Sequence, residues 1–414
     1  MNIVRTDITR SHAAMYSAQA RLLFATLAFT LLSGASEAGR VLPQDAYIWQ
    51  RKWTPAVHAA VTQSADLVRA WRVLAAYSDE GSRLQTVAVD WKALKNSGRP
   101  VVAVVRINGQ LAHYDDDQLL GDLQGLLFRW QRMGAPIAGL ELDHDCGVSR
   151  LAAYARFLAR LRTHLDQTIP LSITALPAWL SSPELDAVLT PANEVVLQVH
   201  MVQSPRAGLF DADQALRWIR AMARRTDKPF RVALPAYGVR VTRREDGSML
   251  AVESEEPLLA GGYSASELIV SPEAVSTFLR ELERDPPASL TGIVWFRLPV
   301  AGDVRAWSPE TWRAVVLGKP LQPRIEALAE RSDTPGMSNI LLVNQGEVDG
   351  VLPAKIDLPP SCTIADGING YALDHGESGL SIERQQDGLL PGHQRRLIGW
   401  MRCTPAQVAI HAQP

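Results

Sequence analysis

The sequence is short of cysteine and of net charge. Only three of its 414 residues are cysteine, and its 42 basic and 44 acidic side chains leave a formal net charge of −2. A near-neutral chain without a lysine- or arginine-rich run lacks the electrostatic footprint of a nucleic-acid-binding protein, and we expect no nucleic-acid partner. With 47% hydrophobic and 21% charged residues, the composition is that of a globular protein with room for one large and one small domain.

Nucleotide-binding and metal-binding motifs are also missing. No G-x-G-x-x-G or P-loop follows a predicted strand, and the chain has neither an H-x-H pair nor an H-E-x-x-H sequence. These absences argue against the usual nucleotide-binding sheet and against the common zinc hydrolases. We therefore predict no cofactor and no bound metal.

The N-terminus has the pattern of a secretory signal. Arg21 precedes an apolar run over residues 22–32, and small residues follow as far as Ala38. The run is too short to cross a bilayer comfortably. We expect residues 1–38 to be a cleaved signal peptide, with export to the periplasm or the cell exterior and no stable membrane insertion afterwards. An uncleaved membrane anchor is the alternative.

Export would place the three cysteines in an oxidising compartment, where disulfides persist. Cys362 and Cys403 both lie in the C-terminal part of the chain, and we expect a disulfide between them. Cys146 would then remain a free thiol, to which we assign no nucleophilic role.

Beyond the signal, short strand-like runs alternate with amphipathic helical patterns. The expected strands cover residues 46–50, 71–77, 100–107, 137–143, 171–175, 194–200, 230–236 and 292–298. Three helices are expected to begin at Ser149, Asp211 and Ser271. Eight alternating strands predict an α/β fold, a (β/α)8 TIM barrel over residues 41–320, although a doubly wound sheet gives the same alternation.

Two segments depart from this alternation. Alternating residues on both sides of Asp246-Gly247 predict a β-hairpin inserted after the seventh strand. Past residue 320, a short helical stretch over 323–331 is expected, followed by strand-like runs at 339–344, 354–358, 371–373, 380–383 and 395–400. We predict a small all-β C-terminal domain, β-sandwich-like, over residues 335–414, which binds polymer or, as we favour, braces the barrel.

Three acidic residues alternate along the fourth predicted strand. In the stretch G-L-E-L-D-H-D, Glu141, Asp143 and Asp145 share one face, which points into the barrel with Asp145 nearest the mouth and Glu141 deepest. Arg106 or Arg297 would neutralise them if they were structural. Two carboxyls this close push their pKa values apart, so that one keeps a proton near neutral pH, as glycoside hydrolysis requires.

We assign Asp145 as the general acid and Asp143 as the group that biases its proton and steadies positive charge in the transition state. Glu141 is the third catalytic candidate.

The acidic stretch resembles the D-G-x-D-x-D-x-E motif of family-18 glycoside hydrolases, the chitinase-like enzymes. In this resemblance Asp145 falls on the general-acid glutamate, Tyr237 lies in a P-x-Y-G-like stretch, and Trp295 lies near the tryptophan that floors the sugar site. His200 and Met201 replace the tyrosine and aspartate that support the substrate's N-acetyl group, so the resemblance does not extend to that route.

A closer resemblance covers nearly the whole mature chain. The stretches L-E-L-D-H-D-C-G and F-R-V-A-L-P-A-Y-G look like the bacterial domain of unknown function 3142 family, which is grouped with the barrel glycosidases. This resemblance implies the barrel fold and supplies no activity.

Sugar sites also use aromatic surfaces and hydroxyl-binding groups near strand ends. The aromatic candidates, of which two or three are expected at the mouth, are Trp49, Trp53, Tyr77, Trp179, Tyr237 and Trp295. The polar candidates are Asn108, Gln198 and His200, and His200 is alternatively a base or a buried, satisfied core residue.

The sequence therefore predicts an exported glycoside-hydrolase-like protein that acts on a polysaccharide or oligosaccharide by carboxylate acid/base catalysis. Three alternatives remain open: an inactive carbohydrate-binding barrel, a metal-dependent hydrolase or deacetylase using Asp143, Asp145 and His200 as ligands, and a structural protein of the envelope. The glycan, its linkage and the oligomeric state are not predicted.

Overall fold

The structure is a computed structural model of the chain. It describes residues 40–78, 83–109, 115–200, 208–243, 249–253, 264–376, 379–404 and 410–413. The predicted signal peptide, residues 1–38, and the predicted turn at Asp246-Gly247 lie outside the described residues.

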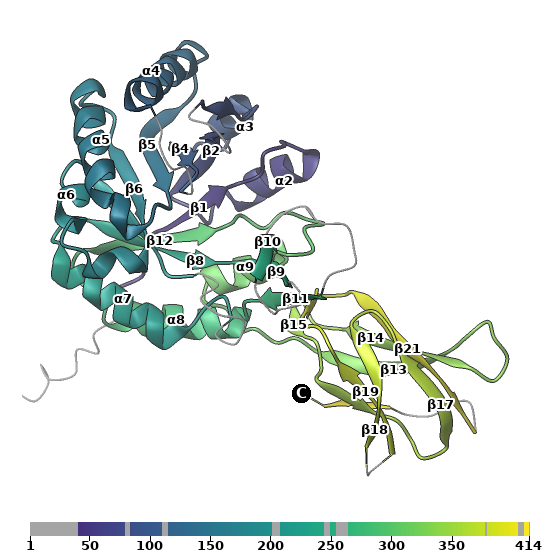
Figure 1. Cartoon of the computed structure of the whole chain (residues 1–414). Helices are drawn as coiled ribbons and strands as arrows, with labels where there is room; N and C mark the ends of the chain where they lie inside the picture. Colours follow the sequence, from purple (N-terminus) through teal and green to yellow (C-terminus); the bar gives the residue numbers. More distant parts are fainter. Residues whose placement is uncertain are drawn as a thin grey trace, which may run out of the picture.

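The first part of the chain forms a closed parallel barrel (Figure 1). Its eight strands are, in order around the barrel, β1 (Gln44–Ile48), β2 (Ala70–Ser78), β4 (Val101–Ile107), β5 (Ile137–His144), β6 (Leu171–Ala175), β7 (Glu194–Gln198), β8 (Phe230–Pro235) and β12 (Leu290–Phe296). Because β1 pairs with both β12 and β2, the sheet closes and leaves no barrel edge unpaired. The predicted TIM barrel is confirmed, and the doubly wound sheet is excluded.

Helices surround the barrel on its outside (Figure 1). Their bounds are α2 (Pro55–Ser64), α3 (Trp91–Asn96), α4 (Asp116–Arg132), α5 (Leu151–His164), α6 (Leu185–Leu189), α7 (Ala212–Arg225), α8 (Pro272–Arg284) and α9 (Pro309–Val316). Asp211 and Ser271 cap α7 and α8 by accepting backbone N–H bonds, as predicted. The prediction for Ser149 is wrong, because residues Val148–Arg150 form a 3-10 turn and α5 starts after it without a side-chain cap.

Alternation along the strands separates two cores. On β5, Leu140 and Leu142 belong to the large core between strands and helices, whereas Glu141 and Asp143 face the barrel interior. The interior also holds a smaller apolar cluster made of Tyr47, Trp49, Leu74, Val87, Val104, Val196, Ala233 and Val294. The acids therefore point inward because the flanking leucines face the helices.

Short antiparallel strands decorate the barrel. β3 (Gln85–Thr86) pairs with the end of β2. After β8, the strands β9 (Gly238–Arg243), β10 (Met249–Glu253) and β11 (Ser264–Ile269) form a three-stranded sheet with β9 in the centre. The pairing of β9 with β10 confirms the predicted hairpin.

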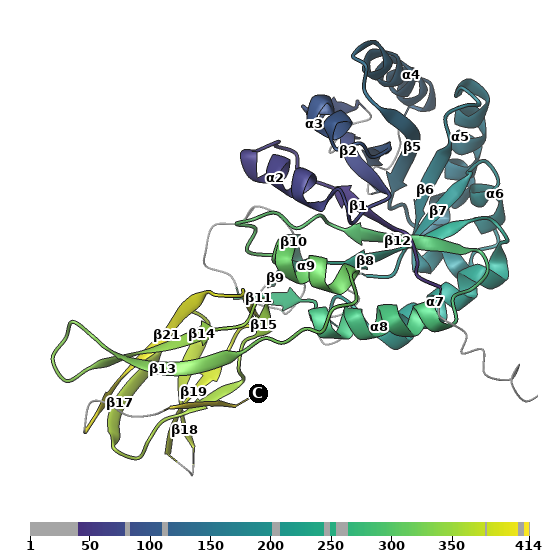
Figure 2. The ribbon, with the colours of Figure 1, turned by 180° about the vertical axis from the view of Figure 1, so that it is seen from behind.

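The C-terminal part is an all-β domain beside the barrel (Figure 2). Its strands are β13 (Ile325–Arg331), β14 (Ser338–Asn344), β15 (Gly350–Val351), β16 (Lys355–Asp357), β17 (Cys362–Gly367), β18 (Tyr371–Gly376), β19 (Gly379–Arg384), β20 (Leu389–Leu390), β21 (Arg395–Cys403) and β22 (His411–Gln413). They form the sheets β13-β14-β21-β17 and β18-β19-β16-β22 with a two-stranded ribbon, around a shared apolar core.

One element of this domain corrects the sequence prediction. Residues 323–331, expected to be helical, instead contain β13, which pairs with β14 along its whole length, so the sheets begin before residue 335. The stretch is rich in alanine, leucine and glutamate, but strand pairing overrides this weak helical preference. A disulfide between Cys362 and Cys403 joins β17 to β21. The C-terminal domain also contacts the barrel: Asp349 accepts a hydrogen bond of 2.7 Å from the backbone N–H of Ser308, the residue that caps α9.

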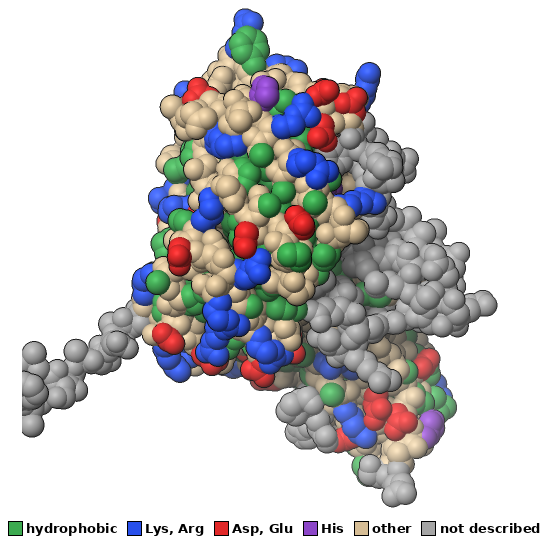
Figure 3. Space-filling model, turned by 60° about the vertical axis from the view of Figure 1, so that its left-hand side comes forward, with side chains coloured by type: hydrophobic (Ala, Val, Ile, Leu, Met, Phe, Trp, Pro, Cys, Tyr) green, Lys and Arg blue, Asp and Glu red, His purple; other side chains and the backbone are tan. Residues whose placement is uncertain are grey.

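On the face shown in Figure 3, basic, acidic and apolar side chains are interspersed over the described part of the surface. No helix within the described ranges is long and apolar enough to cross a membrane.

Candidate active site

The deepest acid of the ladder is held in a buried ion pair. Glu141 is fully buried, and its carboxylate accepts hydrogen bonds from the hydroxyls of Tyr47 at 2.6 Å and Ser172 at 2.9 Å. Arg72, on β2, adds a charge-assisted hydrogen bond. Glu141 thus has partners on three other strands, β1, β2 and β6, of which only β6 pairs directly with β5.

Arg72 is the centre of a larger buried network. It also pairs with Asp45 at 3.2 Å and with Glu194, while Arg231 bonds Glu194 at 2.8 Å. Burial opposes the charged form of Arg72, but attraction by the three carboxylates outweighs burial and raises its pKa. These residues join β1, β2, β5, β7 and β8 near the amino ends of the strands, so they form the floor of the barrel.

Asp143 lies one step higher on β5 and is 2% exposed. Its Oδ1 accepts a hydrogen bond of 2.8 Å from the hydroxyl of Thr174, and its Oδ2 lies 3.2 Å from a guanidinium nitrogen of Arg106. Burial is the largest influence and the charge of Asp145 the next, and together they raise the pKa of Asp143 to about 6 against the pull of Arg106. Asp143 is therefore a buried acid poised to hold a proton near neutral pH.

Asp145 follows β5 at the mouth, where a third of its side chain, 33%, is exposed. Its Oδ2 lies 3.6 Å from Arg106, and its Oδ1 accepts a hydrogen bond of 3.4 Å from the amide of Gln198. The same amide donates to Asp143 at 3.3 Å, so one side chain from β7 bridges both carboxylates. Burial raises the pKa of Asp145, opposed by Arg106 and by the Gln198 hydrogen bond.

The loop after β4 fixes the backbone of Asp145. A Cβ on Gly109 would lie 2.0 Å from the carbonyl oxygen of Asp145, so only glycine permits this approach. Arg150 also donates a hydrogen bond of 3.3 Å to the Gly109 carbonyl. The position of the outermost acid therefore depends on a glycine in a neighbouring loop.

Aromatic side chains form a wall on the β12 side of the mouth. Phe296 contacts Trp49 at 5.1 Å and Tyr237 at 5.2 Å between ring centroids, and it stacks on His200 at 5.4 Å. The guanidinium of Arg106 lies 5.7 Å from the Trp49 ring centroid. The structure thus brings His200, Tyr237 and Trp49, predicted as substrate-binding residues, around one ring that the sequence did not single out.

Trp295 lies elsewhere than expected. It is fully buried outside the barrel, where its indole N–H donates a hydrogen bond of 2.7 Å to Gln44 and its ring packs against Trp307 and Trp312. Its neighbour Phe296 faces the mouth instead, because adjacent strand residues point to opposite faces. The expected sugar-floor role of Trp295 is wrong.

The other aromatic candidates divide in the same way. Trp179 is 1% exposed and donates a hydrogen bond of 2.9 Å to the Cys146 carbonyl, so it belongs to the outer core. Tyr77 and Trp53 are partly buried beside the inner cluster, and the guanidinium carbon of Arg51 lies 4.1 Å from the centroid of the Tyr77 ring. Trp49 and Tyr237 contact Phe296, and Tyr77 and Trp53 pack on the inner cluster, whereas Trp179 and Trp295 belong to the outer core.

Asn108 is the remaining predicted hydroxyl-binding residue, and Cys146 is the thiol to which no role was assigned. Asn108 follows β4 at the mouth, and its backbone N–H donates a hydrogen bond of 3.2 Å to the Ser78 hydroxyl. Cys146 is buried, and burial raises the pKa of its thiol to about 11, so it is not an activated nucleophile. Over the described ranges, no group of three or more His, Cys, Asp or Glu side chains is arranged to hold a metal ion.

Sequence reasoning missed Arg72, Ser172, Thr174 and Phe296. Their signal was alternation: Arg72 interrupts an apolar strand, Ser172 and Thr174 are the polar positions of β6, and Phe296 is two residues after an interior valine. Ser172 and Thr174 each donate to the acid opposite on β5.

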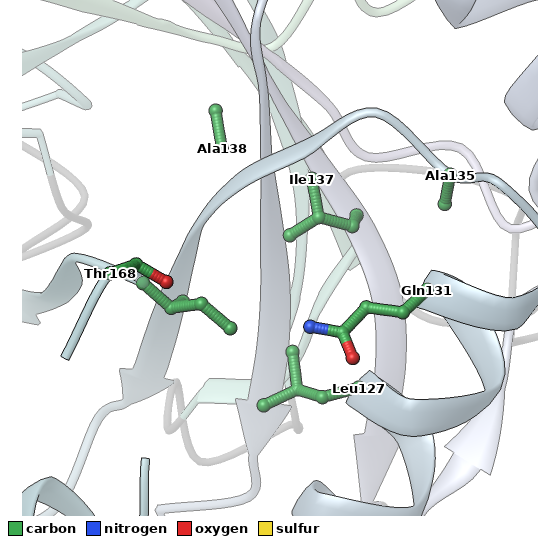
Figure 4. Close-up of a pocket in the computed structure, with 7 residues that line it drawn as sticks. Leu127, Gln131, Ala135, Ile137, Ala138 and Thr168 are labelled. Carbon is green, nitrogen blue, oxygen red and sulfur yellow. The ribbon is translucent and has the colours of Figure 1, made fainter. Parts of the chain in front are cut away.

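A pocket at the other end of β5 is separate from this site (Figure 4). It is lined by Leu127, Gln131, Ala135, Ile137, Ala138, Thr168 and Ile169. The side chains are apolar or uncharged, and the pocket opens near the amino end of the strand, away from Asp145. It carries no group for acid–base chemistry.

Comparison with solved structures finds glycosidase-related proteins at low sequence identity. The spore cortex-lytic enzyme SleL of Bacillus cereus is 12% identical, with 69% of this chain and 76% of that chain covered and a TM-score of 0.48. A chitinase from Chromobacterium violaceum is 13% identical, with 67% and 98% covered and a TM-score of 0.47. A family GH18 chitinase from Chromobacterium violaceum is 11% identical, with 88% of both chains covered and a TM-score of 0.43.

A comparison with curated proteins gives no match. Residues 327–404 match the family model of a second domain of unknown function, DUF8456. Residues 97–301, which run from the approach to β4 to the end of the barrel sheet, match the model of domain of unknown function DUF3142. The predicted relation to the DUF3142 family is therefore confirmed over residues 97–301, a smaller part of the chain than the resemblance implied.

Proposed function

We propose that the protein is a glycoside hydrolase in which Asp145 donates a proton to the glycosidic oxygen. Before the reaction Asp143 shares this proton with Asp145, and afterwards its carboxylate stabilises the positive charge on the sugar ring. The observation that carries the proposal is the pair itself: one partly exposed and one buried carboxyl at the mouth of a barrel, bridged by the amide of Gln198. Glycoside hydrolysis requires one protonated and one ionised carboxyl.

The environment of the pair supports a retained proton. Burial raises the pKa of both acids, and for Asp143 it reaches about 6. Carboxyls this strongly linked titrate as a pair, so the proton belongs to the two together. Asp145 reaches solvent and therefore substrate, whereas Asp143 is enclosed beneath it. We therefore assign proton transfer to Asp145.

The charges that develop in the reaction also have partners. Once Asp145 has given up its proton, its carboxylate lies beside Arg106, 3.6 Å away. The ionised form of Asp143 then faces the positive charge that grows on the sugar ring as the bond breaks. Water completes the reaction by adding to the anomeric carbon, and the proton that it loses returns to the carboxylate of Asp145. Glu141 takes no part in this scheme, because Arg72 and two hydroxyls occupy its carboxylate.

The proposed substrate is a polysaccharide or oligosaccharide. Phe296 is partly exposed, with the buried rings of Trp49 and Tyr237 packed against it, and it offers an apolar surface that the C–H face of a sugar ring can cover. Export fits the signal pattern of residues 1–38, and it also fits the disulfide between Cys362 and Cys403, since disulfides persist in oxidising compartments.

The test is polysaccharide cleavage by the mature protein, residues 39–414, measured as release of reducing ends from a panel of bacterial and plant glycans. Asp145→Asn should lower turnover by about 10²- to 10⁴-fold, the contribution of general acid catalysis. Asp186→Asn, an exposed residue of α6, is the control and should keep full activity. Equal cleavage by the wild type and Asp145→Asn would refute the assignment.

A second candidate function is carbohydrate binding without cleavage. The observation in its favour is Arg106, which pairs with both Asp143 and Asp145 and so favours their ionised forms. In this case a glycan binds to the wild type and to Asp145→Asn with similar affinity, and neither protein releases reducing ends. Calorimetric titration of the same glycans separates this outcome from loss of turnover.

A further inference from the structure

His200 carries a buried nitrogen without a partner at the candidate site. The residue is 6% exposed, and its Nδ1 lies 3.3 Å from the hydroxyl of Tyr237. Its Nε2, in contrast, has no hydrogen-bond partner within the part of the chain that the structure describes. Leaving a buried polar atom unpaired costs free energy, and such atoms in native proteins call for a reason.

The orientation of the ring indicates what Nε2 faces. His200 is two residues beyond Gln198 and projects from the same face, the one on which Gln198 reaches both acids. Within an imidazole, Nε2 lies on the side away from Cβ. A ring that projects inward from the end of β7 therefore carries its buried Nε2 toward the barrel interior.

The ring also has fixed surroundings. It stacks on Phe296 with an angle of 25° between the planes and meets the edge of Tyr237 at 84°. Burial lowers the pKa of His200 to about 4, so the imidazole is uncharged near neutral pH. A neutral imidazole can donate or accept one hydrogen bond at Nε2, according to its tautomer.

We propose that His200 binds a hydroxyl group of an uncharged sugar ring through Nε2, in a subsite walled by Phe296 and Tyr237. A sugar hydroxyl both donates and accepts, so it matches either tautomer, and the flat wall takes the apolar face of the same ring. Tyr237 is a positioning residue, because its hydroxyl holds Nδ1 and so sets the direction of Nε2. This inference rests on the proposed sugar-cleaving function and names the chemistry of one subsite.

Two substitutions of His200 distinguish the role of Nε2 from that of Nδ1. The amide of His200→Asn falls near Nδ1, which keeps the contact with Tyr237 and removes the group at Nε2. The longer amide of His200→Gln falls near Nε2 and gives up the Tyr237 contact. If the substrate binds at Nε2, Asn should raise KM about tenfold with kcat unchanged, the loss of one hydrogen bond made equally in ground and transition states, and Gln should raise it less.

Measurements are made on the mature protein with the glycan that the cleavage panel selects, and thermal melting is recorded for each variant. Binding is also titrated in the Asp145→Asn background with cellohexaose, xylohexaose and N-acetylchitohexaose. The proposed subsite is supported if the His200→Asn variant binds the glycan more weakly than the His200→Gln variant does, in either assay.

A higher glycan affinity of His200→Asn than of His200→Gln overturns the proposal. If His200→Asn binds the glycan like the wild type and His200→Gln has a lower melting temperature, His200 is a core residue held by Tyr237. If both variants lose kcat at unchanged KM, His200 acts in the chemical step and does not bind a hydroxyl. If the wild type neither binds nor cleaves a glycan, the proposed function has failed first; if it does and Asn matches it, only the present inference has failed.

Discussion

Replacing Asp143 by asparagine should change how the stability of the protein depends on pH. Asp143 is 2% exposed, and burial together with the charge of Asp145 raises its pKa from 3.8 to about 6 in the folded protein. In the unfolded chain the same carboxyl titrates near its ordinary value. The folded state therefore binds the proton more tightly, so the stabilisation is present below the unfolded pKa and is lost as pH rises toward 6.

The magnitude follows from the two pKa values. A difference of about two pKa units corresponds to about 3 kcal/mol over the full window, and about 2 to 3 kcal/mol of it falls between pH 4 and pH 7. Asparagine does not titrate. The free energy of unfolding of Asp143→Asn should therefore rise relative to that of the wild type by this amount across the interval.

Urea unfolding at closely spaced pH values gives the comparison directly. The difference in free energy of unfolding between variant and wild type is plotted against pH. Thr174→Val tests the direction of the effect. It removes a hydroxyl that donates a 2.8 Å hydrogen bond to the ionised carboxylate of Asp143, so the pKa of Asp143 and the pH at which the stabilisation is lost should both rise. A flat difference for Asp143→Asn would mean that Arg106 keeps Asp143 ionised throughout, and the acid pair would hold no proton to donate.

Four further predictions concern the floor, the mouth and the C-terminal domain. Glu141→Gln should lower the free energy of unfolding by about 3 kcal/mol in urea titrations, because it leaves Arg72 short of a buried partner; loss of activity without loss of stability would contradict the structural role. Gly109→Ala should cost about 1 to 3 kcal/mol and lower turnover, because the new Cβ meets the Asp145 carbonyl at 2.0 Å, whereas Gly121→Ala on α4 meets no atom within 4 Å and should be harmless by melting temperature. Phe296→Ala should weaken glycan binding in calorimetric titrations, and Trp295→Ala should instead cost about 3 to 5 kcal/mol of stability, because only Phe296 faces the mouth; equal binding losses would argue against this division. Replacing Cys362 and Cys403 by serine should destabilise the C-terminal domain by about 3 to 4 kcal/mol in the chain-entropy model, since the bridged positions are 41 residues apart, and reduction of the wild type should reproduce the shift in its unfolding curve.

The sequence was sufficient for the barrel because its signals are periodic and local. Alternation placed Glu141 and Asp143 on the inner face, and both were found there because Leu140 and Leu142 take the outer one. The same rule failed at Trp295 and Phe296, where both neighbours are apolar aromatics and a shift of one residue exchanges their faces. The register of β12 against β8 decides between them, and register is a property of the assembled sheet.

Ion-pair partners were beyond the sequence for a related reason. Arg106 and Arg297 were both expected to be able to neutralise the acids, but Arg297 lies 2.7 Å from Asp303 and Arg72 reaches Glu141. A long side chain on a strand two positions away around the barrel reaches across the interior, and no spacing along the chain encodes that reach. Likewise, residues 325–331 form a strand because β14 supplies a partner, against their own helical preference.

Glu141 and Asp143 on β5 and Asp145 just after it differ in their partners because they lie at different depths in the barrel. At the floor, Glu141 meets Arg72, and the ion pair and two hydroxyl bonds leave that carboxylate fully engaged. Higher up, Asp143 and Asp145 share Arg106, so one guanidinium faces two carboxyls and the pair gains by keeping a proton. A second cation at this height would favour the ionised form of both acids, and removal of Arg106 would favour their protonated forms. The proposed chemistry therefore depends on the presence of one guanidinium for two carboxyls as much as on the acids themselves. Arg106→Met should raise the pH at which activity is greatest, because both carboxyls then hold their protons more tightly. A pH optimum unmoved by that substitution, measured on the same glycan, would show that the pair is set by burial alone.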